Sequence, residues 1–181
     1  MANTVVITGC GRDRVGIVAE LTSILFEAGC NLLDSSMTLL RGEFALILMA
    51  TLPDSMSVEA LEKQLSQLQE KLKLQLSVRK LSVEELTEQD ADQYQFIVSV
   101  YGADRPGIVS GITRAIAELN LNISDVQTKK ITQGTREIFV MMLEISSKTE
   151  VNADFIKSRL EDKGKSLSVD LTVRELEVME L

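Results

Sequence analysis

The stretch DRVGIV at residues 13–18 recurs as DRPGIV at residues 104–109. Its surroundings recur too, because residues 9–34 align with residues 100–125 without a gap. The identical positions are Gly11/Gly102, Asp13/Asp104, Arg14/Arg105, Gly16/Gly107, Ile17/Ile108, Val18/Val109, Thr22/Thr113, Glu27/Glu118, Asn31/Asn122 and Asp34/Asp125. After the register slips by four residues, LQLSVRKLSVEE (74–85) aligns with VDLTVRELEVME (169–180). Repetition over this length indicates two copies of one domain.

The first half of each copy predicts a strand, a helix and a hairpin. Residues 4–10 and 95–101 are β-branched or aromatic runs, which are typical of strands. Apolar residues then recur at the spacing of a helix with one buried face: Ile17, Leu21, Ile24, Leu25, Ala28 and Ile108, Ile112, Ala115, Ile116, Leu119. Gly29 and Asn120 are suited to the left-handed helix end. The predicted hairpin strands are 31–40 with 44–52, and 122–131 with 136–146, joined by turns at 41–43 and 132–135.

The second half of each copy predicts a helix and a final strand. Ser57 and Asn152 stand where the second helices begin and are good N-cap residues. In the last strands, apolar residues alternate with polar ones. Because the alternation changes phase at Arg79–Lys80 and Arg174–Glu175, a β-bulge is expected at each place.

The order βαββαβ, read twice, predicts an α+β protein made of two ferredoxin-like domains. Right-handed crossovers place both helices on one face of a four-stranded antiparallel sheet. The first domain is expected at residues 1–83 and the second at 95–181. Residues 84–94, which are acidic and lack a sustained apolar period, are expected to form the linker.

Composition excludes several classes of function. The net charge of −8, without a basic cluster, argues against direct nucleic-acid binding, which depends on Lys and Arg. The sequence has no histidine, so histidine-based nucleophile pairs cannot form. Its two cysteines, Cys10 and Cys30, show no metal-ligand spacing, and neither a metal nor a cofactor is expected. The N-terminus lacks the features of a signal peptide and no apolar run could span a bilayer, so a cytoplasmic protein is expected.

With its βαββαβ repeats and the DRxGIV turn before the first helix, the sequence resembles the ACT domain family of small-molecule sensors. The resemblance covers nearly the whole chain, as two tandem ACT domains. Within that family, DRPGIV at 104–109 and GCN at 29–31 followed by Asp34 look most like the glycine cleavage system transcriptional repressor group. The same turn also occurs in ACT domains of formyltetrahydrofolate deformylases and some nucleotidyltransferases.

The resemblance implies an effector site between ACT domains, usually for an amino acid. Carried over by position, the ligand-binding residues are Gly11, Asp13, Arg14, Gly16, Ile17, Asn31 and Asp34 in the first copy, and Gly102, Asp104, Arg105, Gly107, Ile108, Asn122 and Asp125 in the second. A helix N-terminus suits a carboxylate, and an aspartate suits an ammonium group.

Each of these residues also has a structural interpretation. The aspartates 13 and 104 are suited to capping the first helix, the arginines 14 and 105 to solvent or ion pairing, and the glycines 16 and 107 to helix packing. Asn31 and Asn122 are also common turn residues, and Asp34 and Asp125 are equally suited to an exposed sheet face. Pro106 replaces Val15 and fits the first turn of a helix, which predicts a stiffer second loop and two sites that differ.

The resulting hypothesis is a non-catalytic regulator that binds a small amino acid, such as glycine, between domains and modulates a protein partner. By resemblance that partner is a DNA-binding regulator, so that repression occurs without direct DNA contact. The alternative is a regulatory subunit of a metabolic enzyme under amino-acid control. An enzyme in its own right and a purely structural dimerisation module are the less favoured alternatives. A homo-oligomer is compatible with the sequence, and no membrane partner is expected.

Overall fold

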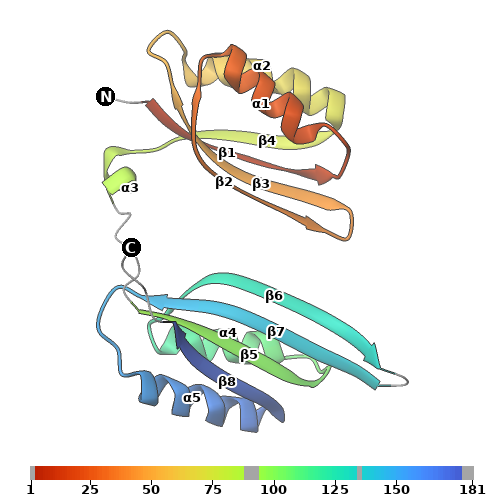
Figure 1. Cartoon of the computed structure of the whole chain (residues 1–181), viewed down its shortest axis with the longest axis vertical. Helices are drawn as coiled ribbons and strands as arrows, with labels where there is room; N and C mark the ends of the chain where they lie inside the picture. The colour runs from red at the N-terminus through yellow and green to blue at the C-terminus, as the bar shows by residue number, and fades with distance from the viewer. Residues whose placement is uncertain (1–2, 88–93, 134–135, 177–181) are drawn as a thin grey trace. The chain divides into compact units, whose positions relative to one another are not determined.

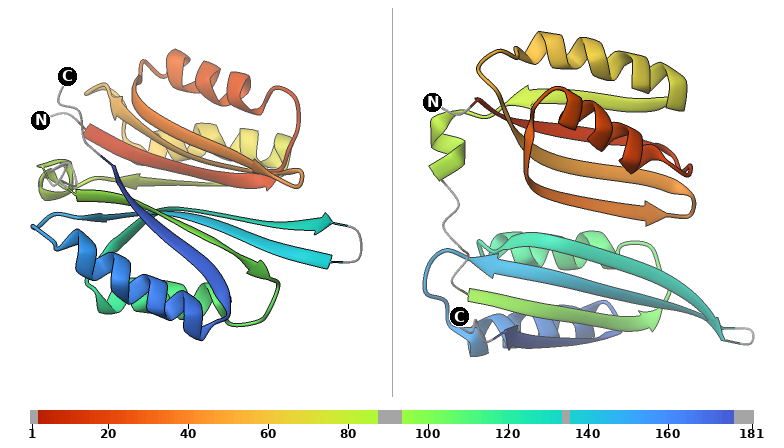
Figure 2. Two further views of the ribbon diagram at one scale, coloured as in Figure 1. Left: turned by 60° about the horizontal axis from the view of Figure 1, so that its bottom comes forward. Right: turned by 45° about the horizontal axis from the view of Figure 1, so that its top comes forward.

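The computed structural model describes residues 3–87, 94–133 and 136–176, which form two compact units, Met1–Gln89 and Asp90–Leu181. Each unit contains one four-stranded antiparallel sheet with two helices packed on one face (Figures 1 and 2). The predicted α+β class and the ferredoxin-like βαββαβ order are therefore confirmed. Part of the predicted linker, residues 84–94, lies outside the described residues.

The two units have the same topology. The first contains β1 (Asn3–Arg12), α1 (Ile17–Glu27), β2 (Asn31–Leu40), β3 (Glu43–Leu52), α2 (Val58–Leu72) and β4 (Leu74–Lys80), with strand order β2-β3-β1-β4. The second contains β5 (Tyr94–Ala103), α4 (Ile108–Glu118), β6 (Asn122–Gln133), β7 (Arg136–Ser147), α5 (Ala153–Ser166) and β8 (Val169–Leu176), with strand order β6-β7-β5-β8. All strand pairs are antiparallel.

Each core lies between the sheet and its two helices. Along β3 the side chains of Phe44, Leu46 and Leu48 are buried, whereas those between them are exposed. The helices contribute one apolar face each, as Leu21 of α1 and Leu65 of α2 illustrate. The alternating residues point to the other side of the sheet, which carries no helix within the unit and is called the open face below.

Most predicted helix ends and turns are confirmed. The side chain of Ser57 accepts a hydrogen bond from Ala60 N at 3.2 Å, and that of Asn152 accepts one from Phe155 N at 2.8 Å. Gly29 and Asn120 have φ values of 70° and 56° just after the first helices. The strands β6 and β7 have 12 residues each, whereas β2 and β3 have 10, and this longer hairpin explains the slip between the repeats.

The predicted bulges lie in the wrong strands. The register between β1 and β4 runs unbroken to Lys80, and that between β5 and β8 runs unbroken to Leu176. The bulges occur instead in β2, between Leu32 and Asp34, and in β6, between Ile123 and Asp125. The turn predicted at 132–135 also starts too early, because β6 continues to Gln133, and residues 134–135 lie outside the described ranges.

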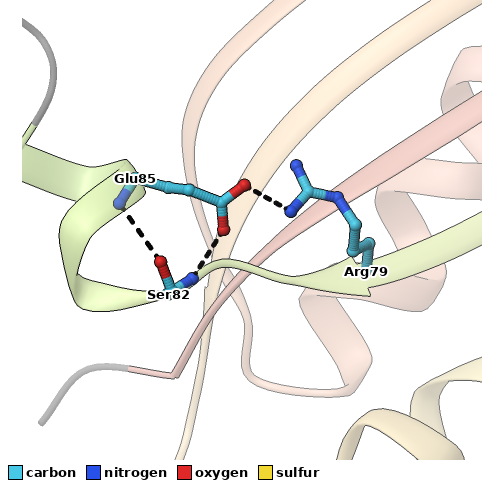
Figure 3. Close-up of polar contacts among 3 residues, drawn as sticks. All are labelled: Arg79, Ser82 and Glu85. Carbon is cyan, nitrogen blue, oxygen red and sulfur yellow. Dashed lines mark hydrogen bonds and ion pairs between the residues drawn. The ribbon is translucent and has the colours of Figure 1, made fainter.

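A short helix, α3 (Val83–Thr87), follows β4 at the start of the predicted linker. Figure 3 shows how it begins: Glu85 N donates to Ser82 Oγ at 3.2 Å, and Ser82 N donates to Glu85 Oε2 at 2.8 Å. This reciprocal pair is a capping box. The other carboxylate oxygen of Glu85 accepts a hydrogen bond from Arg79 at 2.6 Å. Local capping therefore forms a helix where periodicity alone predicts none.

The matching edge strands β2 and β6 differ in character. Every residue of β2 is exposed, including the large apolar side chains of Leu32, Leu33, Met37, Leu39 and Leu40. The corresponding part of β6 carries Lys129 and Lys130. Lysines on an edge strand oppose its pairing with another strand. The edge of the second sheet therefore has a protection that the edge of the first sheet lacks.

Candidate functional site

The repeated DRxGIV motif forms the same loop in both units. Gly16 has φ 98° and ψ −6°, and Gly107 has φ 95° and ψ −9°. An added Cβ atom would meet nothing within 4 Å at either glycine, so helix packing does not require them. The left-handed backbone requires glycine at both positions, because a residue with a side chain is strained at these dihedral angles. The motif therefore specifies a backbone conformation.

The first helix of each unit begins without a side-chain cap. Gly16 and Gly107 occupy the N-cap positions, and no side-chain hydrogen bond caps either helix. The predicted capping role of Asp13 and Asp104 is therefore wrong. Ile17 and Ile108, the first helical residues, are buried and anchor the loops in the cores. Uncapped N–H groups and the partial positive charge of a helix N-terminus are features that favour a bound anion.

Pro106 also lies one position earlier than expected. It precedes the N-cap Gly107 and is therefore outside the first helical turn. The neighbouring glycines have nearly the same dihedral angles in the two loops, so the backbone at the start of the helix is the same after valine and after proline. Since Val15 is fully exposed, the difference between the residues lies in chain stiffness.

Gly11 and Gly102 lie in the strands, before the loops. A Cβ on Gly11 would lie 2.9 Å from Leu74 Cδ2 and 3.1 Å from the carbonyl oxygen of Lys73. A Cβ on Gly102 would lie 2.8 Å from Val169 Cγ1. These distances are too short for an ordinary contact, so both glycines permit close approach of the neighbouring strand. This packing role accounts for their repetition.

The loop aspartates have different surroundings. Asp13 N donates to the carbonyl oxygen of Gly42 at 2.9 Å, which ties the first loop to the β2–β3 turn. The carboxylate of Asp104 forms an ion pair with Lys130 of β6. Leu39 occupies the position of Lys130 in the first unit, and Asp13 forms no ion pair within the described part of the chain. Arg14 and Arg105 are exposed and form no ion pair within the described ranges.

The predicted strand residues lie beside the bulges. Asn31 and Asn122 begin β2 and β6, and the bulges fall just before Asp34 and Asp125. Asp34 Oδ1 accepts a hydrogen bond from Ser35 N at 2.7 Å, and Asp125 Oδ2 accepts one from Gln127 Nε2 at 3.2 Å. A bulge redirects the side chains that follow it and is frequent next to binding sites.

Within one unit the two halves of the predicted site lie at opposite ends of the sheet. The β1–β3 and β2–β3 registers place Arg12 and Leu40 opposite Glu43, whereas Asn31 lies opposite Thr51 at the far end. The 11 residues of α1 lead from one end to the other and alone span about 16 Å. A single unit therefore does not bring Asp13, Arg14 and Gly16 together with Asn31 and Asp34. The same holds for Asp104, Arg105 and Gly107 with Asn122 and Asp125.

Sequence reasoning missed Lys130, Gly42 and Lys73, which lie at the loop end of the sheets. For Lys130, the only local signal was the pair of lysines at 129–130. The contacts of all three residues depend on strand register, which the sequence motif does not reveal.

The two cysteines differ in exposure. Cys10 is exposed, whereas partial burial raises the pKa of the Cys30 thiol. In the described ranges, no three His, Cys, Asp or Glu side chains gather closely enough to hold a metal ion.

A sequence model of the ACT domain matches residues 3–79 and 94–174. A UPF0237 protein of Methanopyrus kandleri is 36% identical over 83 residues, which make up 45% of this chain and 88% of that protein. A UPF0237 protein of Streptococcus pneumoniae is 32% identical over 84 residues, or 46% of this chain and 91% of that protein. These relatives therefore match less than half of this chain.

Two solved structures resemble the whole chain. A protein of unknown function from Galdieria sulphuraria has a TM-score of 0.80 at 23% identity, covering 98% of this chain and 100% of its own. A protein assigned as a glycine cleavage system transcriptional repressor has a TM-score of 0.74 at 20% identity, covering 98% and 99%. At these identities the likeness shows the fold alone. Among the described residues, no helix combines the length and apolar character that crossing a membrane requires. Since the family model covers both repeats, the chain belongs to the ACT domain family, as two ACT domains in tandem.

Proposed function

We propose that this chain is a non-catalytic regulator that binds a small amino acid, such as glycine, and thereby modulates a protein partner. The observation that carries the proposal is the loop that occurs twice, with a left-handed glycine and an uncapped helix N-terminus in each unit. The amino acid's carboxylate is assigned to the helix N–H groups, which have no side-chain competitor.

The ammonium group of the amino acid needs oxygen acceptors, and the carboxylate of Asp104 in the second loop is already paired with Lys130. Asn31 with Asp34, and Asn122 with Asp125, offer suitable oxygen atoms beside a repeated bulge. Because these residues lie at the far end of their own sheet, a complete site needs the loop of one ACT unit and the β2 or β6 start of another. The proposed effector site is therefore shared between units, and a ligand there would favour one pairing of units over others.

The partner is proposed to be a DNA-binding regulator, so that the chain represses transcription without touching DNA. The assignment of the structural neighbour as a glycine cleavage system repressor supports this choice. The net charge of −8 supports the indirect mode, since a protein that bound phosphates itself would need a basic surface. The absence of histidine supports a role without catalysis.

Thermal unfolding of the full chain with each amino acid at millimolar concentration tests the ligand. A ligand that binds only the folded state raises Tm, and glycine or another small amino acid is expected to do so. Asn31→Ala and Asn122→Ala are expected to abolish the shift without lowering the Tm of the free protein. If no amino acid shifts Tm while a nucleotide or folate does, the amino-acid proposal is wrong.

Capture of partners from cell extract with and without the active amino acid tests the second half of the proposal. A transcription factor whose recovery changes with the ligand supports it. A metabolic enzyme recovered in the same way would identify the chain as a regulatory subunit instead.

A further inference from the structure

The open face of the first sheet carries a row of small and polar side chains near its loop end. The strand registers place Thr38, Ala45, Cys10 and Gln75 side by side across β2, β3, β1 and β4. All four residues are exposed. The two in the middle, Ala45 and Cys10, are small, so their own side chains leave space above the sheet.

A cavity of about 480 Å³ lies over this row. Lys73, at the end of α2, and Glu43 and Leu40, from the β2–β3 hairpin, line it together with the row. Ala45 and Leu40 supply apolar surface, and polar groups surround it. Apolar surface with a few placed polar groups is the usual composition of a small-molecule site.

The charges around this cavity favour an anion. Glu43 Oε1 is paired with Arg12 Nη1 at 3.3 Å, so these two charges offset each other. Lys73 forms no ion pair within the described part of the chain, and its ammonium group is available to a ligand. One uncompensated positive charge in a chain of net charge −8 is complementary to a single carboxylate.

Gln75 adds a donor on the same side. Its Oε1 accepts a hydrogen bond from the Cys10 thiol at 3.7 Å. Its Nε2 group can then donate to a ligand oxygen, as an amide carries both functions. Lys73 and Gln75 lie two residues apart and together offer two donors to one carboxylate.

The second unit carries different residues at every position of the row and at the position of Lys73. Tyr101 takes the place of Cys10, Val140 that of Ala45, and Asp170 that of Gln75, as the matching registers show. Ser168 replaces Lys73, with the same left-handed backbone (φ 55° against 53°). The ring of Tyr101 occupies the middle of the row, and Asp170 brings a negative charge where Gln75 brings an amide. Lys129 takes the place of Thr38 and also brings a positive charge to the row. The lysine at the end of the second helix and the amide beside it nevertheless belong to the first unit alone.

We propose that this cavity binds a small organic acid, with the carboxylate at Lys73 and Gln75 Nε2 and a short apolar body over Ala45, Cys10 and Leu40. The site needs residues of the first unit only and does not depend on the shared amino-acid site proposed above. It also selects against amino acids, because Glu43 is already engaged by Arg12 and leaves an ammonium group without a dedicated acceptor.

Cys10 supplies the readout. The sequence contains two cysteines, so a Cys30→Ser background leaves Cys10 as the single thiol. Its alkylation by iodoacetamide is followed by mass spectrometry on the full chain, with hexanoate or the neutral hexanamide present at constant ionic strength. Hexanoate is expected to slow alkylation saturably by about threefold or more at concentrations above its dissociation constant, as occupancy shields the thiol. Hexanamide is expected to have little effect.

Two variants in the same background assign the site. Lys73→Asn removes the charge and keeps a residue that tolerates the left-handed backbone, and it is expected to abolish protection. Lys63→Asn, a matched change on the exposed surface of α2, is expected to retain it. Cys10→Tyr copies the second unit, and hexanoate is expected to raise the Tm of the parent but not of this variant.

Equal protection by hexanamide, or full protection in Lys73→Asn, would overturn the proposal, as would a rate that hexanoate does not change. Circular dichroism of each variant identifies a loss of fold, in which case the hexanoate–hexanamide comparison on the parent decides. A glycine-induced Tm shift that survives Lys73→Asn would separate this site from the shared one.

Discussion

Asp104 forms an ion pair with Lys130, which ties the loop after β5 to the edge strand β6. In the first unit Asp13 faces no such lysine, because Leu39 stands at that position, and its loop is held by the backbone bond from Asp13 N to Gly42. The two DRxGIV loops therefore share a backbone conformation but differ in how they are anchored. Their ligand affinities are expected to differ for this reason.

Lys130→Leu, which copies the first unit, is expected to loosen the second loop. The lysine of the pair is exposed and its aspartate half-buried, so the loss of unfolding free energy should stay within about 1 kcal/mol. Hydrogen exchange at the amides of residues 104–107 should nevertheless accelerate. Lys129→Leu is the matched control, since its side chain points to the open face. Equal acceleration in both variants would contradict the role of the ion pair.

Gly16→Ala and Gly107→Ala are expected to lower the unfolding free energy by about 1 to 2 kcal/mol, because an alanine is strained at positive φ. Denaturant unfolding measures this loss. Gly16→Asn and Gly107→Asn should cost less, since asparagine tolerates that region. If the alanine and asparagine variants are equally stable, the left-handed backbone is not the reason for the glycines.

Val15→Pro is expected to stabilise the first unit by about 0.4 to 1 kcal/mol, because the glycine that follows has the same backbone conformation in both loops and proline restricts the unfolded chain. The reciprocal Pro106→Val should destabilise the second unit by a similar amount. The midpoint of denaturant unfolding measures both. A destabilising Val15→Pro would mean that the two loops are not equivalent in conformation.

The capping box of α3 is expected to be acid-sensitive. The pKa of Glu85 is lowered by hydrogen bonding from the Ser82 backbone and then by Arg79. A carboxyl whose folded pKa is depressed contributes stability above its unfolded value of about 4.5, and this is lost as the pH falls through the folded value. Amide shifts of Ser82, titrated from pH 6 downward by NMR, should change in this acid range. Glu85→Gln should remove the transition, whereas Glu84→Gln should keep it.

Cys10 is expected to react with iodoacetamide faster than Cys30 in the native chain. Cys10 is exposed, whereas burial raises the pKa of Cys30 and reduces the thiolate fraction at neutral pH. Peptide mass spectrometry over a time course measures both rates. In denaturant the difference should disappear, and a difference that persists there would point to local sequence as its cause.

Sequence pattern was sufficient for the fold because its signals are local and occur twice. Ser57 and Asn152 mark the starts of their helices because their side chains are good N-caps. Gly29 and Asn120 mark the ends of theirs because both residues tolerate a positive φ. The candidate site was harder to predict, since Asp13 and Gly16 are both plausible caps and only the dihedral angles decide between them.

The short repeated motif did not predict which residues lie close together across the sheet. Gly16 and Asn31 stand close in sequence, yet α1 carries the chain along the sheet and separates them. The pairing of Asp104 with Lys130 and the row from Thr38 to Gln75 depend on strand register, which no short motif encodes.

The contrast between the edge strands bears on biosynthesis. The first unit leaves the ribosome before the second, so β2 is complete while much of the chain is still being made. Its uncharged run at Ser35–Leu40 presents free backbone groups beside apolar side chains throughout that interval. The strand β6, which is synthesised later, carries Lys129 and Lys130, and these charges oppose pairing with another strand. Nascent chains of this protein are therefore expected to self-associate, or to bind chaperones, mainly through their first half.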